Sequence, residues 1–473
     1  MSAPHPAGDA TPRAGTVGVV GAGLAGLSAA VYLRRAGFDV RIYDPAPAGG
    51  KAVTLEPTPG WRIEWGPHSF TSRAYALFEL ADVLGIGDRP VRLGAAAGTR
   101  FLVRGGKLRS APFGGAIRLG EALGLLRGLF RRVTDVPGES VRAWVARRFG
   151  EAFAAGPLDA MMTGIWASDP ATIEMDVAFP TVTDLVRSEG TVFRAMRELR
   201  RMTTVLREAG AARTAGTWGL PGGMGEIAAA ARGFLGEGCF VPEAVTRITG
   251  TPGAYTLHHA RGADRVARIV VAAEAPVAAD LLAALAPDAA AGLREVRYAP
   301  LAVAHWHAAN AAYPRGFGYL TPHAEHRPVL GTIFVSDLFP ERAPAGHRSF
   351  ATMIGGARHA EDVAIDPAEA QRRIEAEHLA LTGRPVTVAG LHLVRHTTAV
   401  APPLLGHADR LARIHAGLPG GIFVAGAWCG AGAMDDAIRS GRDAATSVGS
   451  DASWGGGKAP RNAPQDPVVS DVQ

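Results

Sequence analysis

The chain of 473 residues is 47% apolar, which is enough to bury a large core and predicts two or more domains. Its 49 basic and 44 acidic residues leave a net charge of only +5, and no basic run alternates with aromatic residues, which argues against nucleic-acid binding. Two cysteines, Cys239 and Cys429, are too few for a disulfide framework or a metal site, so we expect no metal and a reducing, cytoplasmic location.

Both ends of the chain differ in composition from the rest. Residues 1–15 lack the apolar stretch of a signal peptide, and we interpret them as a disordered leader. Residues 449–473 are rich in Gly, Pro, Ser and Asp, and we interpret them as a disordered tail. No run of 18 apolar residues occurs in the chain, which argues against a membrane-spanning helix.

Residues 17–44 have the order of strand, glycine turn, helix and strand that is typical of a dinucleotide site. The apolar run from Val17 predicts a buried parallel strand. Gly21, Gly23 and Gly26 follow it in GxGxxG spacing, which permits a tight turn, close approach of a pyrophosphate and close packing of helix on strand. Asp44 ends the second strand, where its carboxylate can accept hydrogen bonds from both ribose hydroxyls.

The chain after Asp44 changes character several times. Two glycine turns surround a short pair of strands in residues 45–70, and residues 115–210 have apolar side chains at helical spacing. Strand-like runs return between residues 298 and 400. A last strand begins at Ile422 and leads into Gly426, Gly430 and Gly432, which precede another helix.

This second glycine loop distinguishes between the two common dinucleotides. It offers another set of backbone amides at a helix start, which suits a cofactor with a long polar linker that is held at two points. FAD has such a linker and NAD needs no second clamp, so the sequence predicts FAD. No second GxGxxG follows a strand, so we find no site for a nicotinamide reductant. We therefore expect an oxidase or dehydrogenase that takes electrons from its substrate.

Several longer motifs resemble a known superfamily. The stretches VVGAGLAGLSAA, GGK, EWGPHSF, FVAGAWCGAG and AIRSG are similar to the flavin-containing amine oxidases, which include phytoene desaturases and protoporphyrinogen oxidases. The inner motifs GIWASDP, TWGLPGGMGEI, GFGYLTP and LGTIFVSDLFPERAP occur in the order typical of the oxygen-dependent protoporphyrinogen oxidase branch. The resemblance covers residues 16–448.

The resemblance implies an α/β fold (α+β overall) made of three interwoven domains. A discontinuous, Rossmann-like FAD-binding domain would comprise residues 16–90, 216–297 and 405–448. Residues 91–215 would form a mainly helical domain that faces substrate or membrane. Residues 298–404 would form an antiparallel sheet that binds the substrate.

The reaction that the resemblance implies is the oxidation of a porphyrinogen in haem biosynthesis. Protoporphyrinogen IX or coproporphyrinogen III would lose six electrons in three flavin cycles, with hydride transfer to flavin N5 and molecular oxygen as the acceptor. No catalytic side chain is expected, because the protein's task is to orient the tetrapyrrole and exclude competing reactions. The alternatives are a related flavin oxidoreductase, amine-oxidase-like or phytoene-desaturase-like, and a non-catalytic FAD-binding scaffold.

The resemblance also assigns residues to cofactor and substrate. Arg100 would pair with a propionate, because a planar bidentate donor suits a carboxylate, and Gly164 would permit close approach of the tetrapyrrole. Leu320, Ile333 and Met353 would form apolar walls. The alternatives are a surface role for Arg100 and ordinary core packing for the three apolar residues. The cofactor-binding residues would be Gly21, Gly23, Gly26, Asp44, Gly49, Gly50, Lys51, Gly66, Val245, Gly426 and Met434.

Some positions depart from the family pattern and leave open whether the substrate differs. Lys51 replaces an arginine, which keeps the charge but loses the bidentate geometry. Ala427 stands where relatives have Asp or Asn, and Glu274 stands at a threonine position. His68 replaces a frequent asparagine, and we expect it and Glu64 to make structural hydrogen bonds instead of catalysing a step.

Residues 116–132, AIRLGEALGLLRGLFRR, alternate leucine and phenylalanine with arginine. This pattern is compatible with a basic amphipathic helix that lies on a lipid surface, which would make the protein peripheral to the inner face of a membrane. The alternative is a helix that packs its apolar face on its own domain.

Overall fold

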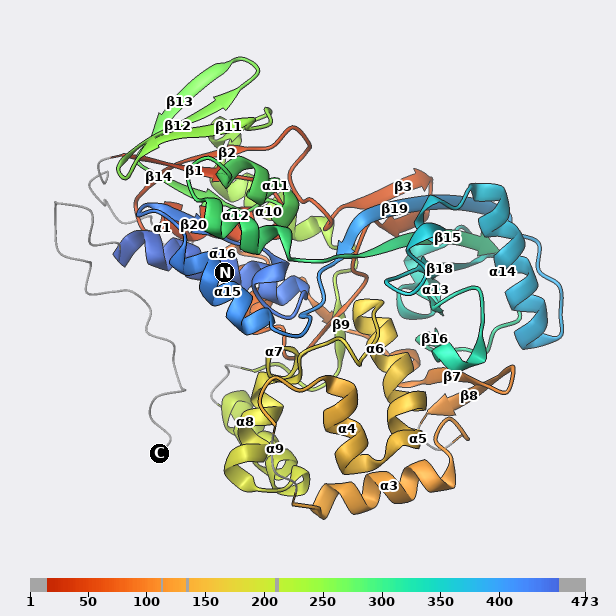
Figure 1. The fold of residues 1–473 in the computed structure, drawn as a ribbon. Helices are drawn as coiled ribbons and strands as arrows, with labels where there is room; N and C mark the ends of the chain where they lie inside the picture. Colours follow the sequence, from red (N-terminus) through yellow and green to blue (C-terminus); the bar gives the residue numbers. More distant parts are fainter. Residues whose placement is uncertain (1–14, 112–113, 133–135, 209–211, 451–473) are drawn as a thin grey trace.

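The computed structural model describes residues 15–111, 114–132, 136–208 and 212–450. The interpreted leader up to residue 14 and the tail from residue 451 lie outside the described residues. One boundary was wrong: residues 449–450 belong to the last turns of helix α16 (Met434–Ser450), because its apolar face continues as far as the buried Val448. Figure 1 shows three parts, with a parallel sheet at the upper left, a second sheet at the right and a layer of helices below.

A five-stranded parallel sheet forms the first part, in the order β10-β2-β1-β14-β20. Its strands β1 and β14 are buried almost throughout, as parallel strands between two layers are. One face packs on helices α1, α2, α10 and α16, and the other packs on α11, α12 and a three-stranded antiparallel sheet, β11-β12-β13. The bounds are β1 Thr16–Val20, β2 Asp39–Tyr43, β10 Phe240–Val241, β11 Arg247–Thr251, β12 Ala254–His259, β13 Gly262–Val266, β14 Arg268–Val271, β20 Ile422–Val424, α1 Leu24–Arg35, α2 Tyr75–Val83, α10 Gly225–Leu235, α11 Ala275–Leu282, α12 Pro287–Arg294 and α15 His407–Ala416.

Two small sheets join this part to the others. The predicted strand pair after Asp44 is present as β3 (Thr54–Thr58) and β4 (Trp61–Glu64). A three-stranded sheet combines β5 (Phe70–Thr71), β9 (Thr217–Gly219) and β6 (Val91–Arg92), so segments far apart in the chain meet here.

The second large sheet has seven strands in the order β19-β15-β18-β17-β16-β7-β8, and all neighbours are antiparallel except β16 and β7. One of its faces carries an aromatic core that includes Trp306, Tyr319 and Phe350, which packs beside helix α14 (Pro367–Thr382). The bounds are β7 Arg100–Arg104, β8 Lys107–Ala111, β15 Ala299–Ala308, β16 Gly318–Leu320, β17 Gly331–Ile333, β18 Arg348–Gly355 and β19 Gly390–Val400; the short helix α13 is Val335–Leu338.

The assignment of residues 91–215 to one mainly helical domain was wrong at its start. Residues 100–111 form a hairpin, β7-β8, that extends the seven-stranded sheet. Gly105 and Gly106 have φ angles of 57° and 70°, which a two-residue hairpin turn requires and glycine adopts easily. The helices of this region are α3 Leu119–Phe130, α4 Val141–Phe149, α5 Glu151–Phe153, α6 Asp159–Trp166, α7 Met175–Ala178, α8 Pro180–Glu189 and α9 Val192–Glu208.

Candidate active site

The GxGxxG turn connects β1 to α1 at the carboxyl end of the parallel sheet. A Cβ on Gly26 would lie 1.9 Å from the Gly21 carbonyl oxygen, so helix and turn pack too closely for any side chain. Gly21 has a φ of 106°. A Cβ on Gly23, in contrast, would meet nothing within 4 Å. The open side of the turn is therefore at Gly23, beside the first unpaired amides of α1.

A second glycine turn lies opposite the first. The Gly49 amide donates to the Ala22 carbonyl oxygen at 2.8 Å. Gly50 has a φ of 57°, and a Cβ there would lie 3.0 Å from the Cα of Gly23. The two turns thus form a cradle of backbone, which we call the glycine cradle (Gly21–Gly26 and Gly49–Gly50).

Asp44 lies at the rim of the glycine cradle. Its Oδ2 accepts from the Ala22 amide at 2.7 Å and its Oδ1 from the Ala46 amide at 2.8 Å. These bonds fix a half-buried carboxylate directly after β2, where a ribose would lie beside it. Val245 is buried just beyond β10, the strand that pairs with β2.

The C-terminal glycine loop reaches the same edge of the sheet, because β20 is parallel to the other strands and α16 follows it as α1 follows β1. A Cβ on Gly441 would lie 2.1 Å from the Ala25 carbonyl oxygen, so α16 rests directly on α1. Gly426 is held by a hydrogen bond of 2.9 Å from its amide to Ser440 Oγ, and Met434 is the first residue of α16. Two helix N-termini therefore meet at this edge.

Two of the departures from the family pattern contact each other. Lys51 Nζ donates to Glu274 Oε1 at 2.7 Å and to the Thr398 carbonyl oxygen at 2.5 Å. Thr398 Oγ1 in turn donates to the other oxygen of Glu274 at 2.5 Å. Gly66 lies against the same turn, since its Cβ would be 2.5 Å from the Lys51 carbonyl oxygen. The pair joins the glycine turn and the end of β14 to strand β19 of the second sheet.

The residues around the glycine cradle fit an FAD. The open side at Gly23, two facing glycine turns, a carboxylate at the rim and a second helix N-terminus match a dinucleotide with a long polar linker. When bound, the flavin supplies two-electron oxidation chemistry. The residues of the glycine cradle would hold it.

The four predicted substrate residues on strands share one face of the seven-stranded sheet. Arg100 and Ile333 lie opposite the same residue of β16, and Leu320 and Met353 lie opposite the same residue of β17. Directly opposed residues point to one face, and so do residues two apart in a strand. The fifth residue, Gly164 of α6, covers this face, because a Cβ there would lie 2.6 Å from Leu320 Cδ2. We call this face the substrate wall (Arg100, Gly164, Leu320, Ile333 and Met353).

Strand β19 connects the substrate wall to the region of Gly66, one of the predicted cofactor residues. His396 lies on the same face, in register with β15, and bonds to the Trp65 carbonyl oxygen at 2.8 Å, one residue before Gly66. Arg100 lies at the other side of the wall. Its guanidinium bonds Thr217 Oγ1 at 3.1 Å and lies 4.8 Å from the Phe317 ring centroid, and within the described part of the chain it has no carboxylate partner.

A buried ion pair beneath the wall is a feature that the sequence did not predict. Arg342 Nη1 donates to Glu64 Oε1 at 2.7 Å, and both side chains are about 1% exposed. Glu64 also accepts from Thr54 and from the Met224 amide. The expected structural role of Glu64 is therefore confirmed. For His68 it is not, since the buried Nε2 atom has no partner among the described residues.

His68 makes stability sensitive to acid. Burial, with a smaller contribution from Arg342, lowers the pKa of His68 to about 3, and burial lowers that of His407 to about 4. Each neutral, buried histidine contributes fully to stability above about pH 6.5, the pKa of histidine in the unfolded chain. This contribution is lost as the pH falls toward the pKa in the folded protein, because only the unfolded chain then takes up the proton.

We expect the free energy of unfolding to fall by about 2 kcal/mol for each of these two histidines when the pH is lowered from 7 to 5. In His68→Asn this loss should shrink by about 2 kcal/mol, as urea unfolding at the two pH values will measure. His258→Asn serves as the control, because that ring is partly exposed and bonds to Thr249 Oγ1. Equal losses in His68→Asn and the unchanged protein would contradict the prediction.

The fold defines an FAD-dependent oxidoreductase with two glycine turns beside a sheet that carries the predicted substrate residues. The predicted fold class is confirmed. The chain belongs to the flavin containing amine oxidoreductase family, whose profile matches residues 24–449, and it is an FAD-dependent oxidase.

Sequence relatives refine the position within this family. The chain is 28% identical to human protoporphyrinogen oxidase, over 92% of this chain and 98% of the relative, and 27% identical to Arabidopsis thaliana chloroplastic protoporphyrinogen oxidase 1, over 89% and 87%. These matches place the chain on the protoporphyrinogen oxidase branch.

Solved structures share the fold. A putative protoporphyrinogen oxidase from Exiguobacterium sp. 255-15 superposes with a TM-score of 0.79 at 18% identity, covering 93% of this chain and 99% of that one. Cyclohexylamine oxidase from Brevibacterium oxydans gives a TM-score of 0.67 at 18% identity, covering 92% and 98%.

Proposed function

We propose that the protein oxidises a porphyrinogen, protoporphyrinogen IX or coproporphyrinogen III, to the porphyrin, with molecular oxygen as the electron acceptor. The observation that supports this most is the substrate wall, in which Arg100, without a carboxylate partner among the described residues, borders an apolar face that adjoins the glycine cradle. An apolar tetrapyrrole macrocycle with acid side chains matches such a face. The glycines, Asp44, Lys51, Val245 and Met434 would hold the cofactor, and the substrate wall would hold the tetrapyrrole.

The substrate test is anaerobic mixing of the yellow protein with each porphyrinogen, following the flavin absorption. Bleaching by a porphyrinogen, with porphyrin fluorescence when air is admitted, is expected. Amines and polyenes are the comparison substrates, because the fold is shared with cyclohexylamine oxidase. Bleaching by one of these alone would replace the proposal. If no tested donor bleaches the flavin, the proposed substrate is wrong.

Arg100 provides a residue-level test. Its guanidinium has no carboxylate partner among the described residues, so it is available to a propionate. We expect Arg100→Ala to lower kcat/KM for the porphyrinogen by about 10- to 100-fold, the loss of a charge-assisted hydrogen-bonded pair, with FAD retained. Arg41→Ala, which removes an exposed arginine on β2, is the control. An unchanged kcat/KM in Arg100→Ala would remove Arg100 from the site.

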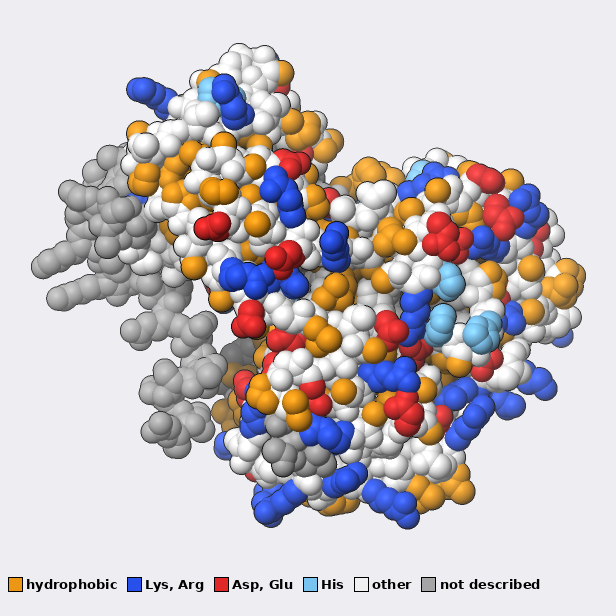
Figure 2. All heavy atoms as spheres, viewed as in Figure 1, with side chains coloured by type: hydrophobic (Ala, Val, Ile, Leu, Met, Phe, Trp, Pro, Cys, Tyr) orange, Lys and Arg blue, Asp and Glu red, His pale blue; other side chains and the backbone are white. Residues whose placement is uncertain are grey.

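We also propose that helix α3 rests on a membrane surface. Packing on its own domain accounts for Leu125 and Leu129, which lie against the core of the helical region, and α3 meets α4 through Gly124 and Gly128, whose Cβ atoms would lie about 2.2 Å from Phe149. It does not account for Leu123, Leu126 and Phe130, which are exposed. Leu119 is 78% exposed. Figure 2 shows Lys and Arg side chains along the lower edge of the molecule, where α3 lies. Within the described residues, no helix has both the length and the apolar character to cross a bilayer.

Flotation with anionic liposomes at low salt tests this contact. We expect the protein to float, and Leu119→Glu/Leu126→Glu to stay in the dense fraction, because a charged side chain cannot enter the lipid interface. Leu379→Glu is the matched control, since Leu379 is a half-exposed leucine on α14, remote from α3. Equal flotation of all three proteins would contradict the role of α3.

A further inference from the structure

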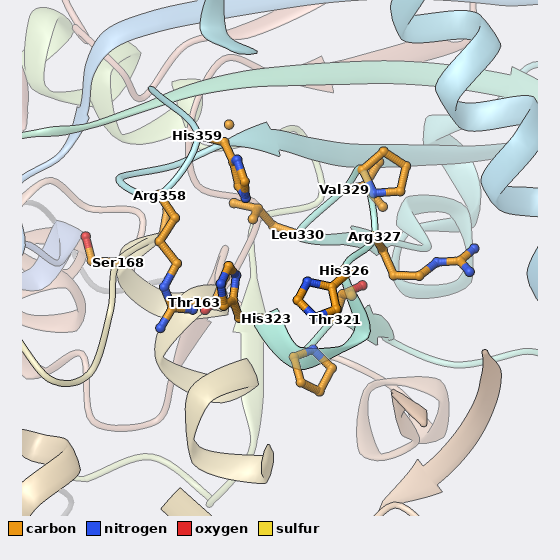
Figure 3. Close-up of a pocket in the computed structure, with 14 residues that line it drawn as sticks. Thr163, Ser168, Thr321, His323, His326, Arg327, Val329, Leu330, Arg358 and His359 are labelled. Carbon is orange, nitrogen blue, oxygen red and sulfur yellow. The ribbon is translucent and has the colours of Figure 1, made fainter. Parts of the chain in front are cut away.

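A cavity of about 310 Å³ lies at the end of the substrate wall and is separate from the glycine cradle. Thr163 of α6, Ser168 just after this helix, the 321–330 segment and the 355–359 segment enclose it (Figure 3). Histidine side chains gather on the molecular surface in this region (Figure 2). None of the residues assigned to cofactor or substrate from the sequence lines it.

Every titratable side chain that lines the cavity is a base, and no carboxylate of the described residues lines it. His323 lies near two other histidines, with ring centroids 5.9 Å from His326 and 6.1 Å from His359. Arg358 Nη2 bonds Asp159 at 2.7 Å and Asp169 at 3.0 Å, and Arg327 Nη2 bonds Glu377 at 2.6 Å. None of these three acids lines the cavity, and they fix the two guanidiniums in place. The lining is thus a set of donors for an oxyanion.

Three hydroxyls in the lining have no partner. Thr163, Ser168 and Thr321 are each more than nine-tenths buried, and their hydroxyl oxygens make no hydrogen bond in the described structure. An unsatisfied buried hydroxyl costs stability, so three of them around one cavity indicate a ligand that supplies the missing partners. A metal does not fit, because no group of three His, Cys, Asp or Glu side chains among the described residues is arranged to hold one.

The cavity borders the substrate wall. Thr163 precedes Gly164 and Thr321 follows Leu320, both of the substrate wall, and Gly355 lies two residues after Met353 on the same sheet face. Arg100 is on β7 and Gly355 on β18, three strand spacings apart, or about 14 Å across the sheet. Anion-binding groups therefore lie at both sides of the wall.

We propose that this cavity binds a propionate carboxylate of the porphyrinogen at the edge of the macrocycle away from Arg100. The cavity then favours a porphyrinogen with acid side chains on opposite edges. Coproporphyrinogen III, with four propionates, satisfies both Arg100 and the cavity at once, whereas protoporphyrinogen IX carries its two propionates on neighbouring rings. This inference rests on the proposed function and selects between its two substrates.

The test compares both porphyrinogens in two variants of the FAD-loaded protein. Thr163→Val/Thr321→Val keeps the shape of the lining and removes unsatisfied hydroxyls, so its Tm should not fall. His323→Ala removes a ring from the centre of the cluster. In both we expect kcat/KM for coproporphyrinogen III to fall about tenfold and that for protoporphyrinogen IX less than twofold, as loss of a hydrogen bond to a charged group predicts. Titration with the product coproporphyrin III should show the same weakening.

Thr332→Val is the matched control. Thr332 is also a buried threonine, but its hydroxyl bonds Tyr319 and Thr352 on the opposite face of the sheet. Thr332→Val should lower the Tm but leave the ratio of kcat/KM for the two porphyrinogens unchanged. If both cavity variants are active and the ratio of kcat/KM for the two porphyrinogens is unchanged in them, the proposed subsite is overturned but the proposed function is not. Failure of the unchanged protein to oxidise either porphyrinogen would overturn the proposed function and the subsite with it.

Discussion

Replacing Gly26 by alanine is expected to abolish the retention of FAD. The added Cβ would lie 1.9 Å from the Gly21 carbonyl oxygen and 3.3 Å from Ala272 Cβ. Backbone cannot yield as a flexible side chain does, so α1 must move away from β1 and the turn must open. The amides at the start of α1 then no longer point at one pyrophosphate, and we expect affinity for FAD to fall more than 100-fold, the loss of two or more hydrogen bonds to a charged group.

The measurement is the ratio of flavin to protein absorbance after purification, followed by titration with FAD. Gly233→Ala is the matched control, because Gly233 lies in helix α10, is exposed, and has nothing within 4 Å of its added Cβ. That variant should bind FAD fully and gain up to about 1 kcal/mol of stability from its helix propensity. A yellow Gly26→Ala protein with unchanged affinity would show that the tight turn is not needed.

The glycine cradle was predictable because its signals are local in the chain. Gly21, Gly23 and Gly26 act within one strand, turn and helix, and Asp44 ends the next strand, so spacing alone places them together. The structure has β1, α1 and β2 where the sequence predicts them. The second clamp at Gly426 was predictable for the same reason, since it repeats the order of strand, glycine loop and helix.

The arrangement of the substrate wall depends on strand register, which the residues themselves do not reveal. Arg100 was assigned to a helical domain, although the alternation around Phe101 and the Gly105–Gly106 pair is a hairpin signal. Only the parallel pairing of β7 with β16 brings Arg100 to the face that carries Leu320. Such a pairing joins residues more than 200 apart in the chain, and no local pattern specifies it.

The Lys51–Glu274 pair illustrates a second limit. Each residue was identified as a departure from the family pattern, but one lies in a glycine turn and the other 223 residues further along, at the start of α11. Because the pair also holds Thr398 of β19, the two exchanges are linked in one polar network between the sheets. A lysine in place of arginine is tolerated when an acid takes up its single point charge.

The last prediction concerns the buried pair of Glu64 and Arg342, which joins the end of β4 to the segment before β18 of the seven-stranded sheet. Arg342 ends the short helical turn after α13, and its Nη2 also donates to the Leu220 carbonyl oxygen at 2.5 Å. Its guanidinium lies 3.9 Å from the Phe339 ring. Burial raises the pKa of Glu64, and the nearby Arg342 opposes that rise, so the carboxylate depends on this partner.

We expect Arg342→Met to lower the free energy of unfolding by about 3–5 kcal/mol, because it leaves a buried carboxylate without its counter-charge. Glu64→Gln/Arg342→Met should recover a large part of this loss, since an amide oxygen at the Oε2 position still accepts from Thr54 and the Met224 amide. The deficit of Arg342→Met relative to the unchanged protein should also be smaller at pH 5 than at pH 8. An acid whose folded pKa is raised contributes stability at low pH and loses it as the pH rises. Urea unfolding of the three proteins at both pH values measures all of this. A double variant no more stable than Arg342→Met would mean that the arginine acts through its packing on Phe339 and not through Glu64.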